Sequence, residues 1–207
     1  MIRLPIANGD LAALIVSTSF AAGLNVYATV ATLGLLGHYQ MVVLPDALNL
    51  ITSWWVIAAA GVLFTIEFVA DKIPAFDLIW NALHTFIRVP VAALMAWGAT
   101  SHLSPQMQML ATIAGGLIAF AAHGGKTAAR AAVTPSPEPV SNFALSMGED
   151  VTAVGLTWIA TQHPYIGAGF VVIALAATLL LMRWVIRAMK KLFSTGPATT
   201  TAGNGSI

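Results

Sequence analysis

The stretch Glu67–Arg88, EFVADKIPAFDLIWNALHTFIR, collects ionisable side chains in a chain that is otherwise strongly apolar. Of the 207 residues, 58% are hydrophobic and only 8% are charged, whereas soluble domains carry about 25% charged residues. This composition predicts an integral membrane protein. The stretch is therefore either a solvated loop between two buried elements or a functional site.

Net charge and cysteine content narrow the classes of function. The formal net charge is only +1, so bulk charge gives no reason to expect a nucleic-acid partner. The chain contains no cysteine, which excludes disulfides, thiolate metal sites and cysteine catalysis. An apolar run after Arg3 has some features of a signal peptide, but apolar residues continue to Leu36 and favour a retained first helix.

Hydropathy on both sides of the opening stretch predicts six transmembrane helices, because one span needs about 20 mostly apolar residues. We expect a single helical domain over 1–193 and a disordered cytoplasmic tail over 194–207. Three prolines in TPSPEP (134–139) predict an extended connection between the fourth and fifth spans. The predicted spans are 10–36, 49–70, 77–101, 107–131, 144–161 and 165–190.

The distribution of basic residues predicts the orientation. In this arrangement the external connections are 37–48, 102–106 and 162–165, and none of them contains a lysine or arginine. Cytoplasmic loops are the ones enriched in basic residues. We therefore predict a multi-pass membrane protein with both termini in the cytoplasm. A re-entrant segment at 71–90, in place of the start of a full span, is the alternative.

Helical spacing places the polar residues of the opening stretch on one face. Asp77, Asn81, His84 and Arg88 follow one another at intervals of four, three and four residues. Ionisable groups inside a membrane are costly and often functional, although structural ion pairs and snorkelling side chains are the alternative. Similar polar sets recur on the first, second, fourth and fifth spans. The candidate substrate-binding residues are Asn25, Glu67, Asp71, Asp77, His84, Arg88, His123, Lys126, Arg130, Glu149 and Asp150.

Known catalytic and metal motifs fit the sequence poorly. GGKT at 124–127 resembles the end of a phosphate-binding loop, but Phe120 stands where that motif needs glycine. Carboxylates and histidines are suitable metal ligands, yet they have no recognised spacing, and the nearby basic residues would oppose a cation. We expect no catalytic residue, no metal and no cofactor. SFAAGLNVYATVATLGLLG (19–37) and NFALSMGEDVTAVGLTWIA (142–160) share a loose pattern, so a three-plus-three inverted repeat is a further hypothesis.

Three blocks of the sequence resemble the bacterial membrane family called domain of unknown function 4126. They are GLNVYATVATLGLLG (23–37), the opening stretch, and the segment from HGGKTAAR to TPSPEPVSNFALSMGED (123–150). The resemblance covers about residues 10–190. It implies a small multi-span protein of the bacterial inner membrane and brings no established activity.

The sequence leads to a transporter or channel-like protein with a polar site open to the cytoplasm. The basic residues would attract an anionic or zwitterionic solute or lipid head group, and the acidic residues would hold those cations in place. A membrane scaffold with structural buried charges is the alternative, and a membrane enzyme acting on lipid is the third hypothesis. Expected partners are membrane lipids, a small ligand of that class and a second copy in a homodimer.

Overall fold

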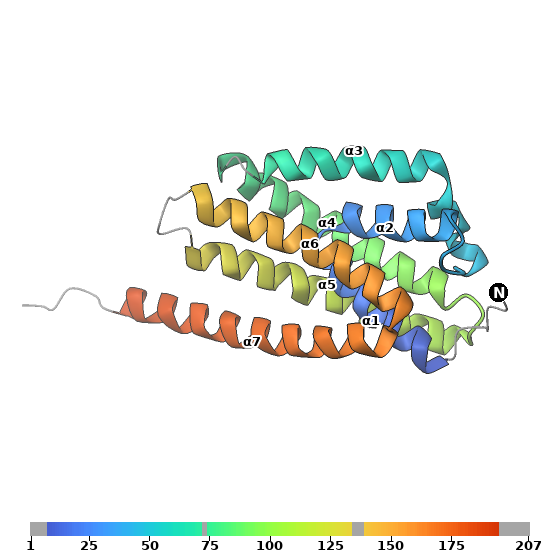
Figure 1. Cartoon of the computed structure of the whole chain (residues 1–207). Helices are drawn as coiled ribbons and strands as arrows, with labels where there is room; N and C mark the ends of the chain where they lie inside the picture. Colours follow the sequence, from blue (N-terminus) through green and yellow to red (C-terminus); the bar gives the residue numbers. More distant parts are fainter. Residues whose placement is uncertain (1–7, 72–73, 134–138, 195–207) are drawn as a thin grey trace, which may run out of the picture.

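The computed structural model of the chain describes residues 8–71, 74–133 and 139–194, with side chains at 9–71, 80, 83–130 and 143–190. All regular elements in these ranges are helices (Figure 1), which confirms the all-α prediction. The elements are α1 (Asn8–Leu24), α2 (Val26–His38), the short 3-10 helix η1 (Asp46–Thr52), α3 (Trp54–Ala70), α4 (Pro74–Ala99), α5 (Pro105–Val133), α6 (Pro139–Gln162) and α7 (Pro164–Ser194).

Prolines begin four of these helices: Pro74, Pro105, Pro139 and Pro164 are the first residues of α4 to α7. A proline suits this position because its fixed φ fits the helix and its missing N–H would have no intrahelical acceptor there. The α4 helix continues through Pro90 to Ala99. The segment from residue 74 to residue 90 is therefore one uninterrupted helix and contains no helical hairpin.

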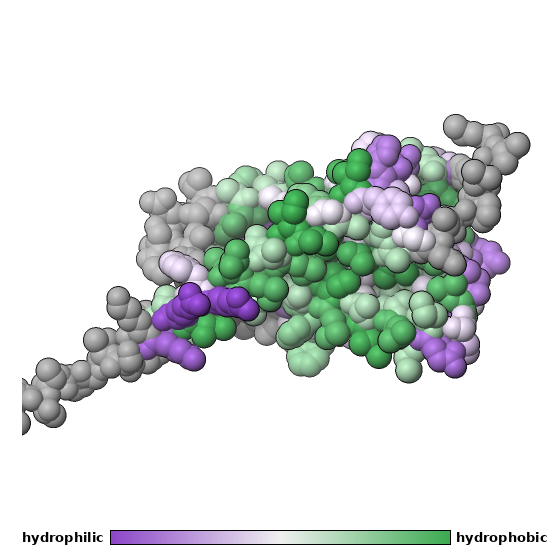
Figure 2. All heavy atoms as spheres, turned by 90° about the horizontal axis from the view of Figure 1, so that it is seen from below, coloured by the Kyte–Doolittle hydropathy of each residue, from purple (hydrophilic) through white to green (hydrophobic). Residues whose placement is uncertain are grey.

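Two helices in the described residues, Pro105–Arg130 and Pro164–Lys190, are long and apolar enough to cross a membrane. A third candidate is the pair formed by η1 and α3, which bends by 61° between its two parts. The apolar helices indicate membrane association, while the predicted number of six spans is not established. In Figure 2, apolar residues cover the middle of the visible face and polar residues gather toward its two ends.

The predicted first span, 10–36, is not a single helix. It is divided at Asn25, which has an extended backbone (φ −148°, ψ 105°) and whose side chain accepts a hydrogen bond from the Ala28 amide. Such an N-cap starts a new helix, and α2 runs back toward the end of the molecule where α1 begins (Figure 1). Leu11, near the start of α1, and Leu33, near the end of α2, belong to one apolar cluster. The prediction of one straight span here is therefore wrong, and the two helices form a hairpin with Asn25 at its buried tip.

The hairpin changes how the chain is threaded through the bundle. The start of α1, the end of α2 and the connections at 100–104 and 163 lie at the same end of the molecule (Figure 1). We call it the hairpin end, because the open side of the hairpin lies there. The ends of α3, α5 and α7 lie at the opposite end, the α7 end. Because the hairpin returns the chain to the end where α1 began, the start of α1 and the end of α7 lie at opposite ends. This differs from the predicted arrangement with both termini on one side.

Small residues let α1 occupy the centre of the bundle, in contact with α4, α5, α6 and α7. Ala21 and Ala22 are fully buried. A Cβ atom on Gly23 would lie 2.4 Å from the Ala119 carbonyl oxygen of α5, so only glycine permits this approach. On α5, Gly115 and Ala119 are also buried, and small residues of this kind allow close contact between helices.

Candidate functional site

Ion-paired and polar side chains gather between the tip of the hairpin and the α7 end of the bundle. We call this set the charge network. It includes every predicted site residue except Asp77, whose side chain lies outside the described residues. Its members come from the hairpin tip, α3, α4, α5 and α6, and they are Asn25, Glu67, Asp71, His84, Arg88, His123, Lys126, Arg130, Glu149 and Asp150.

Arg88 forms the most deeply buried ion pair of the network. Its side chain and that of Glu67 are fully buried and joined by an ion pair between Nη2 and Oε1. Arg88 Nη1 also lies 2.9 Å from His123 Nδ1. Because a guanidinium group can only donate, His123 Nδ1 must accept. The ring therefore carries its hydrogen on Nε2 and donates it to Thr85 Oγ1 at 2.8 Å.

Lys126 and Arg130, one turn apart on α5, share two carboxylates. Lys126 Nζ lies 2.9 Å from Glu149 Oε2 and 3.3 Å from Asp71 Oδ2. It is also 3.7 Å from Glu67 Oε1. Arg130 Nη2 lies 2.8 Å from Asp71 Oδ2 and 2.9 Å from Glu149 Oε2. Shared carboxylates of this kind stabilise two buried cations that would otherwise repel each other.

The hairpin tip reaches the network through Asn25. Asn25 Nδ2 donates a hydrogen bond to Asp150 Oδ1 at 2.8 Å, while Asn25 Oδ1 caps α2. Both residues are buried, with 0% of Asn25 and 6% of Asp150 exposed. One amide side chain therefore ties the break between two helices to a carboxylate on α6.

His84 lies one turn before Arg88 on α4 and points to the hairpin. Its Nδ1 lies 2.7 Å from the Trp80 carbonyl oxygen, which can only accept, so Nδ1 donates. Its Nε2 lies 3.0 Å from the Tyr27 hydroxyl group, and the two rings meet edge to face. Tyr27 thus extends the polar contacts from α4 to the first turn of α2.

Sequence reasoning missed three hydroxyl side chains that contact the network: Tyr27, Thr85 and Ser146. Ser146 is fully buried, and its Oγ donates to Asp71 Oδ2 at 3.4 Å. Ser146 precedes Asp150 by one helical turn, so helical spacing was a signal that could have found it. The other two are adjacent or nearly adjacent in sequence to predicted residues, but a hydroxyl in an apolar helix gives no such signal by itself.

Several buried polar atoms of the network lack a hydrogen-bond partner among the described residues. They include one oxygen each of Glu67, Asp71 and Asp150, and Nε of Arg88. Buried polar groups in proteins are nearly always paired. The network can therefore form further hydrogen bonds with a ligand or with water, and its carboxylate oxygens can take up a proton.

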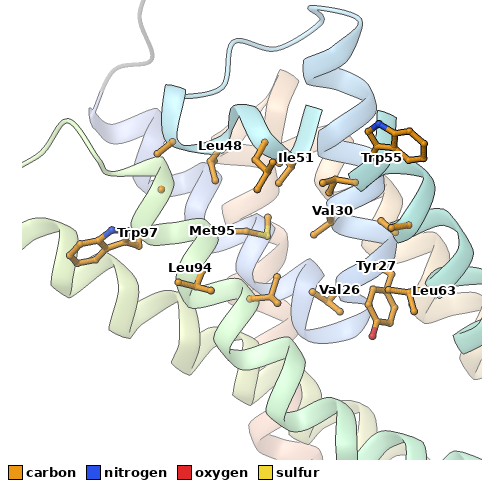
Figure 3. Close-up of a pocket in the computed structure, with 17 residues that line it drawn as sticks. Val26, Tyr27, Val30, Leu48, Ile51, Trp55, Leu63, Leu94, Met95 and Trp97 are labelled. Atoms are coloured by element: carbon orange, nitrogen blue, oxygen red, sulfur yellow. The ribbon is translucent and has the colours of Figure 1, made fainter. Parts of the chain in front are cut away.

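Two cavities approach this site. One, of about 410 Å³, lies between α1, α5, α6 and α7, and Lys126 and Glu149 belong to its lining. The other, of about 670 Å³, is lined by apolar residues of α2, η1, α3 and α4 together with Tyr27 (Figure 3). The first cavity gives the charged groups a route to a small polar ligand. Tyr27, in the lining of the second cavity, connects it to the network through its hydrogen bond to His84.

Comparison with known proteins gives the family and nothing on activity. No curated protein and no solved structure matches the chain. The family described as Domain of unknown function (DUF4126) matches residues 12–184, a range that contains every member of the charge network. The chain belongs to this family, as its sequence blocks predict.

Proposed function

We propose that the protein is a small membrane transporter or channel-like protein that binds a polar solute at the charge network. The observation that carries this proposal is a buried set of acids and bases that meets the tip of a helix hairpin and lines a cavity. Broken or re-entrant helices that end near the middle of a membrane line solute sites in many transporters. Backbone of this kind is tolerated at that depth only inside protein or beside water.

The proposed topology has five crossings, α3 to α7, and a re-entrant α1–α2 hairpin. Exposed Arg183, Arg187 and Lys190 lie near the end of α7, whereas the segments 39–53 and 100–104 at the opposite end contain no lysine or arginine. The positive-inside rule then places the α7 end in the cytoplasm. The bacterial inner membrane is the location that the family resemblance implies.

Because the chain has no cysteine, single cysteines can test this topology directly. We would introduce Gly9→Cys, Ser101→Cys and Lys190→Cys separately and label sealed vesicles of known orientation with a membrane-impermeant maleimide. The proposal expects Gly9→Cys and Ser101→Cys to react from one side and Lys190→Cys from the other. Labelling of Gly9→Cys from the same side as Lys190→Cys would contradict the re-entrant hairpin and support a continuous first span.

The charge balance of the network favours a zwitterion over a simple anion. The described side chains contribute four carboxylates (Glu67, Asp71, Glu149, Asp150) and three strong bases (Arg88, Lys126, Arg130). An anion would have to displace a carboxylate from its cation and leave that carboxylate unpaired. A zwitterion can insert between the cation and the carboxylate, so that two ion pairs replace one. The cavity of about 410 Å³ falls within the range of about 300–1,000 Å³ found for small-molecule sites.

One observation favours a scaffold function instead. Each of the three strong bases already contacts a carboxylate at 3.3 Å or less, as expected if the charges only hold the helices together. A scaffold would respond to substitutions through stability alone, with no solute effect.

A thermal-shift experiment in detergent distinguishes the two functions, because a solute that binds only the folded state raises its apparent stability. We would compare phosphocholine and glycine betaine, both zwitterions, with inorganic phosphate. We expect a zwitterion to raise the melting temperature of the parent protein, and to have no such effect on Lys126→Gln.

Arg183→Gln, which removes an exposed basic residue from α7, is the matched control and should keep the response. A stabilising solute would then be tested for flux in liposomes. Equal responses of the parent protein and Lys126→Gln, or flux no faster than in empty liposomes, would contradict the proposal and leave the scaffold function.

A further inference from the structure

We infer that Asp150 is the proton-binding carboxyl group of the charge network, and that Asn25 at the hairpin tip controls its affinity for the proton. This inference names the ion that would couple to the proposed function. The inference is tested on purified protein without a transport assay. The inference and the proposed function can therefore each fail while the other stands.

Asp150 differs from the other buried carboxylates of the network. Glu67 pairs with Arg88, and Asp71 and Glu149 each pair with Lys126 and Arg130. Within the described part of the chain, Asp150 has no ion-pair partner within 4.0 Å. Its Oδ1 accepts a hydrogen bond from the Asn25 side-chain amide. Its Oδ2 is buried without a hydrogen-bond partner among the described residues.

The surrounding charges leave Asp150 as the excess carboxylate. Three strong bases balance three carboxylates, so an ionised Asp150 would give the described network a net charge of about −1 if both histidines are neutral. An uncompensated charge in an apolar interior is costly and is commonly removed by protonation. The titratable and charged groups around Asp150 are Tyr27 on α2, Glu67 on α3, Asp71 at the C-cap of α3, His84 and Arg88 on α4, His123, Lys126 and Arg130 on α5, and Glu149 on α6.

The protonation step is a proton transfer from solvent. A hydronium ion gives a proton to a carboxylate oxygen of Asp150, so that one O–H bond of hydronium breaks, one O–H bond of a neutral carboxylic acid forms, and a water molecule is released. The new O–H group can donate a hydrogen bond, while Oδ1 still accepts from Asn25. The last carbonyl groups of a helix lack intrahelical donors, and those of α1 lie at the same helix break, where the Ala21 carbonyl oxygen already accepts from the Asn25 backbone amide.

A metal cation fits this position less well than a proton. The described residues contain no group of three His, Asp or Glu side chains that could hold a metal ion. Asp150 and Asn25 alone offer too few oxygen ligands for a hard cation, which takes about six or more. We therefore assign the site to the proton and treat sodium as a competing outcome.

Infrared difference spectroscopy of the full-length protein in detergent tests the assignment. Acidification should produce the C=O band of a buried carboxylic acid, which shifts in D₂O. We expect this band to be lost in Asp150→Asn and kept in Asp46→Asn, which removes an exposed carboxylate from η1. An unchanged band in Asp150→Asn would overturn the assignment, as would a band that responds to sodium at constant pH and not to acidification.

A second variant keeps the inference testable if Asp150→Asn does not fold. Serine also caps helices well, so Asn25→Ser should preserve the start of α2 while removing the amide group that donates to Asp150. The Asn25 hydrogen bond is stronger to the carboxylate than to the neutral acid, so its loss should raise the pH of half-protonation by about one unit. A half-protonation pH equal to that of the parent protein would overturn the role of Asn25.

Discussion

The two ends of the bundle bury different kinds of side chain. At the hairpin end, Leu11, Leu33, Leu48 and Ala99 form an apolar cluster. Toward the α7 end, the buried interior consists largely of ion pairs and hydrogen-bonded side chains. Apolar packing tolerates some exchange of partners, whereas a buried charge needs groups of opposite charge placed close to it. Substitutions in the two regions should therefore act through different physical causes.

The largest effect is expected in the charge network, from Arg88→Met. This change leaves Glu67 buried without its closest cation and removes the hydrogen bond that Arg88 donates to His123. Loss of one partner of a buried pair should lower the free energy of unfolding by about 3–5 kcal/mol. Equilibrium unfolding in mixed micelles measures the change.

The double substitution Glu67→Leu with Arg88→Met is the control for this prediction. Replacement of both partners by apolar side chains removes the unpaired charge and should recover most of the lost stability. A double variant as unstable as Arg88→Met would show that packing around Arg88, and not its charge, determines stability at this position.

Close packing of the hairpin should give the second largest effect. In Gly23→Ala, the new methyl group would lie 2.4 Å from the Ala119 carbonyl oxygen and 2.7 Å from the Ala122 Cβ atom. Overpacking of this kind costs about 1–3 kcal/mol. Thermal unfolding should show a lower melting temperature than that of the parent protein.

Gly155→Ala is the matched control, because a Cβ atom at Gly155 would have no neighbour within 4 Å. In a helix interior this change should stabilise the protein by about 0.5–1 kcal/mol. Equal destabilisation by the two alanines would mean that glycine flexibility, and not close contact, is what α1 needs at residue 23.

A smaller effect is expected where the two regions meet, from Asn25→Ala. The change removes the N-cap of α2, which costs about 0.5–2 kcal/mol. Chemical unfolding of Asn25→Ala and Asn25→Ser side by side measures it, since serine should retain most of the cap. A serine variant less stable than the alanine variant would argue against capping as the cause.

The smallest effect is expected from Arg183→Gln, outside both regions. Its side chain is exposed near the end of α7, and surface changes of this kind usually alter stability by no more than about 0.5 kcal/mol. Its unfolding midpoint should match that of the parent protein. A loss comparable to that of Arg88→Met would mean that exposed basic residues matter as much as the buried network.

Much of the helical content was predictable from the sequence, because proline and hydropathy mark the helix ends. The predicted span 107–131 corresponds to α5 (Pro105–Val133), and 165–190 corresponds to α7 (Pro164–Ser194). Helical spacing also predicted that Arg88 and His84 share a face. The hairpin was not predicted, because residues 11–36 are mostly apolar and contain no proline, so that only Asn25 marks the turn.

Some features of the site follow only from tertiary structure. The sequence placed acids and bases at a similar depth, but it did not pair Lys126 with Glu149 or leave Asp150 without a cation. Pairing depends on which helices become neighbours, and helix periodicity does not contain that information. The inverted repeat and the homodimer stay predictions.

The hairpin is synthesised before most of the helices that it contacts. The α1 helix is synthesised first, yet it packs against α4 to α7, and the donor group of Asn25 bonds to Asp150, which is 125 residues later in the chain. Chains fold from the N-terminus as synthesis proceeds. The hairpin tip must therefore exist with its amide unsatisfied until α6 has been added. We expect chains truncated before α6 to be degraded faster than the full-length protein, because α1 and α2 then lack some of the helices against which they pack.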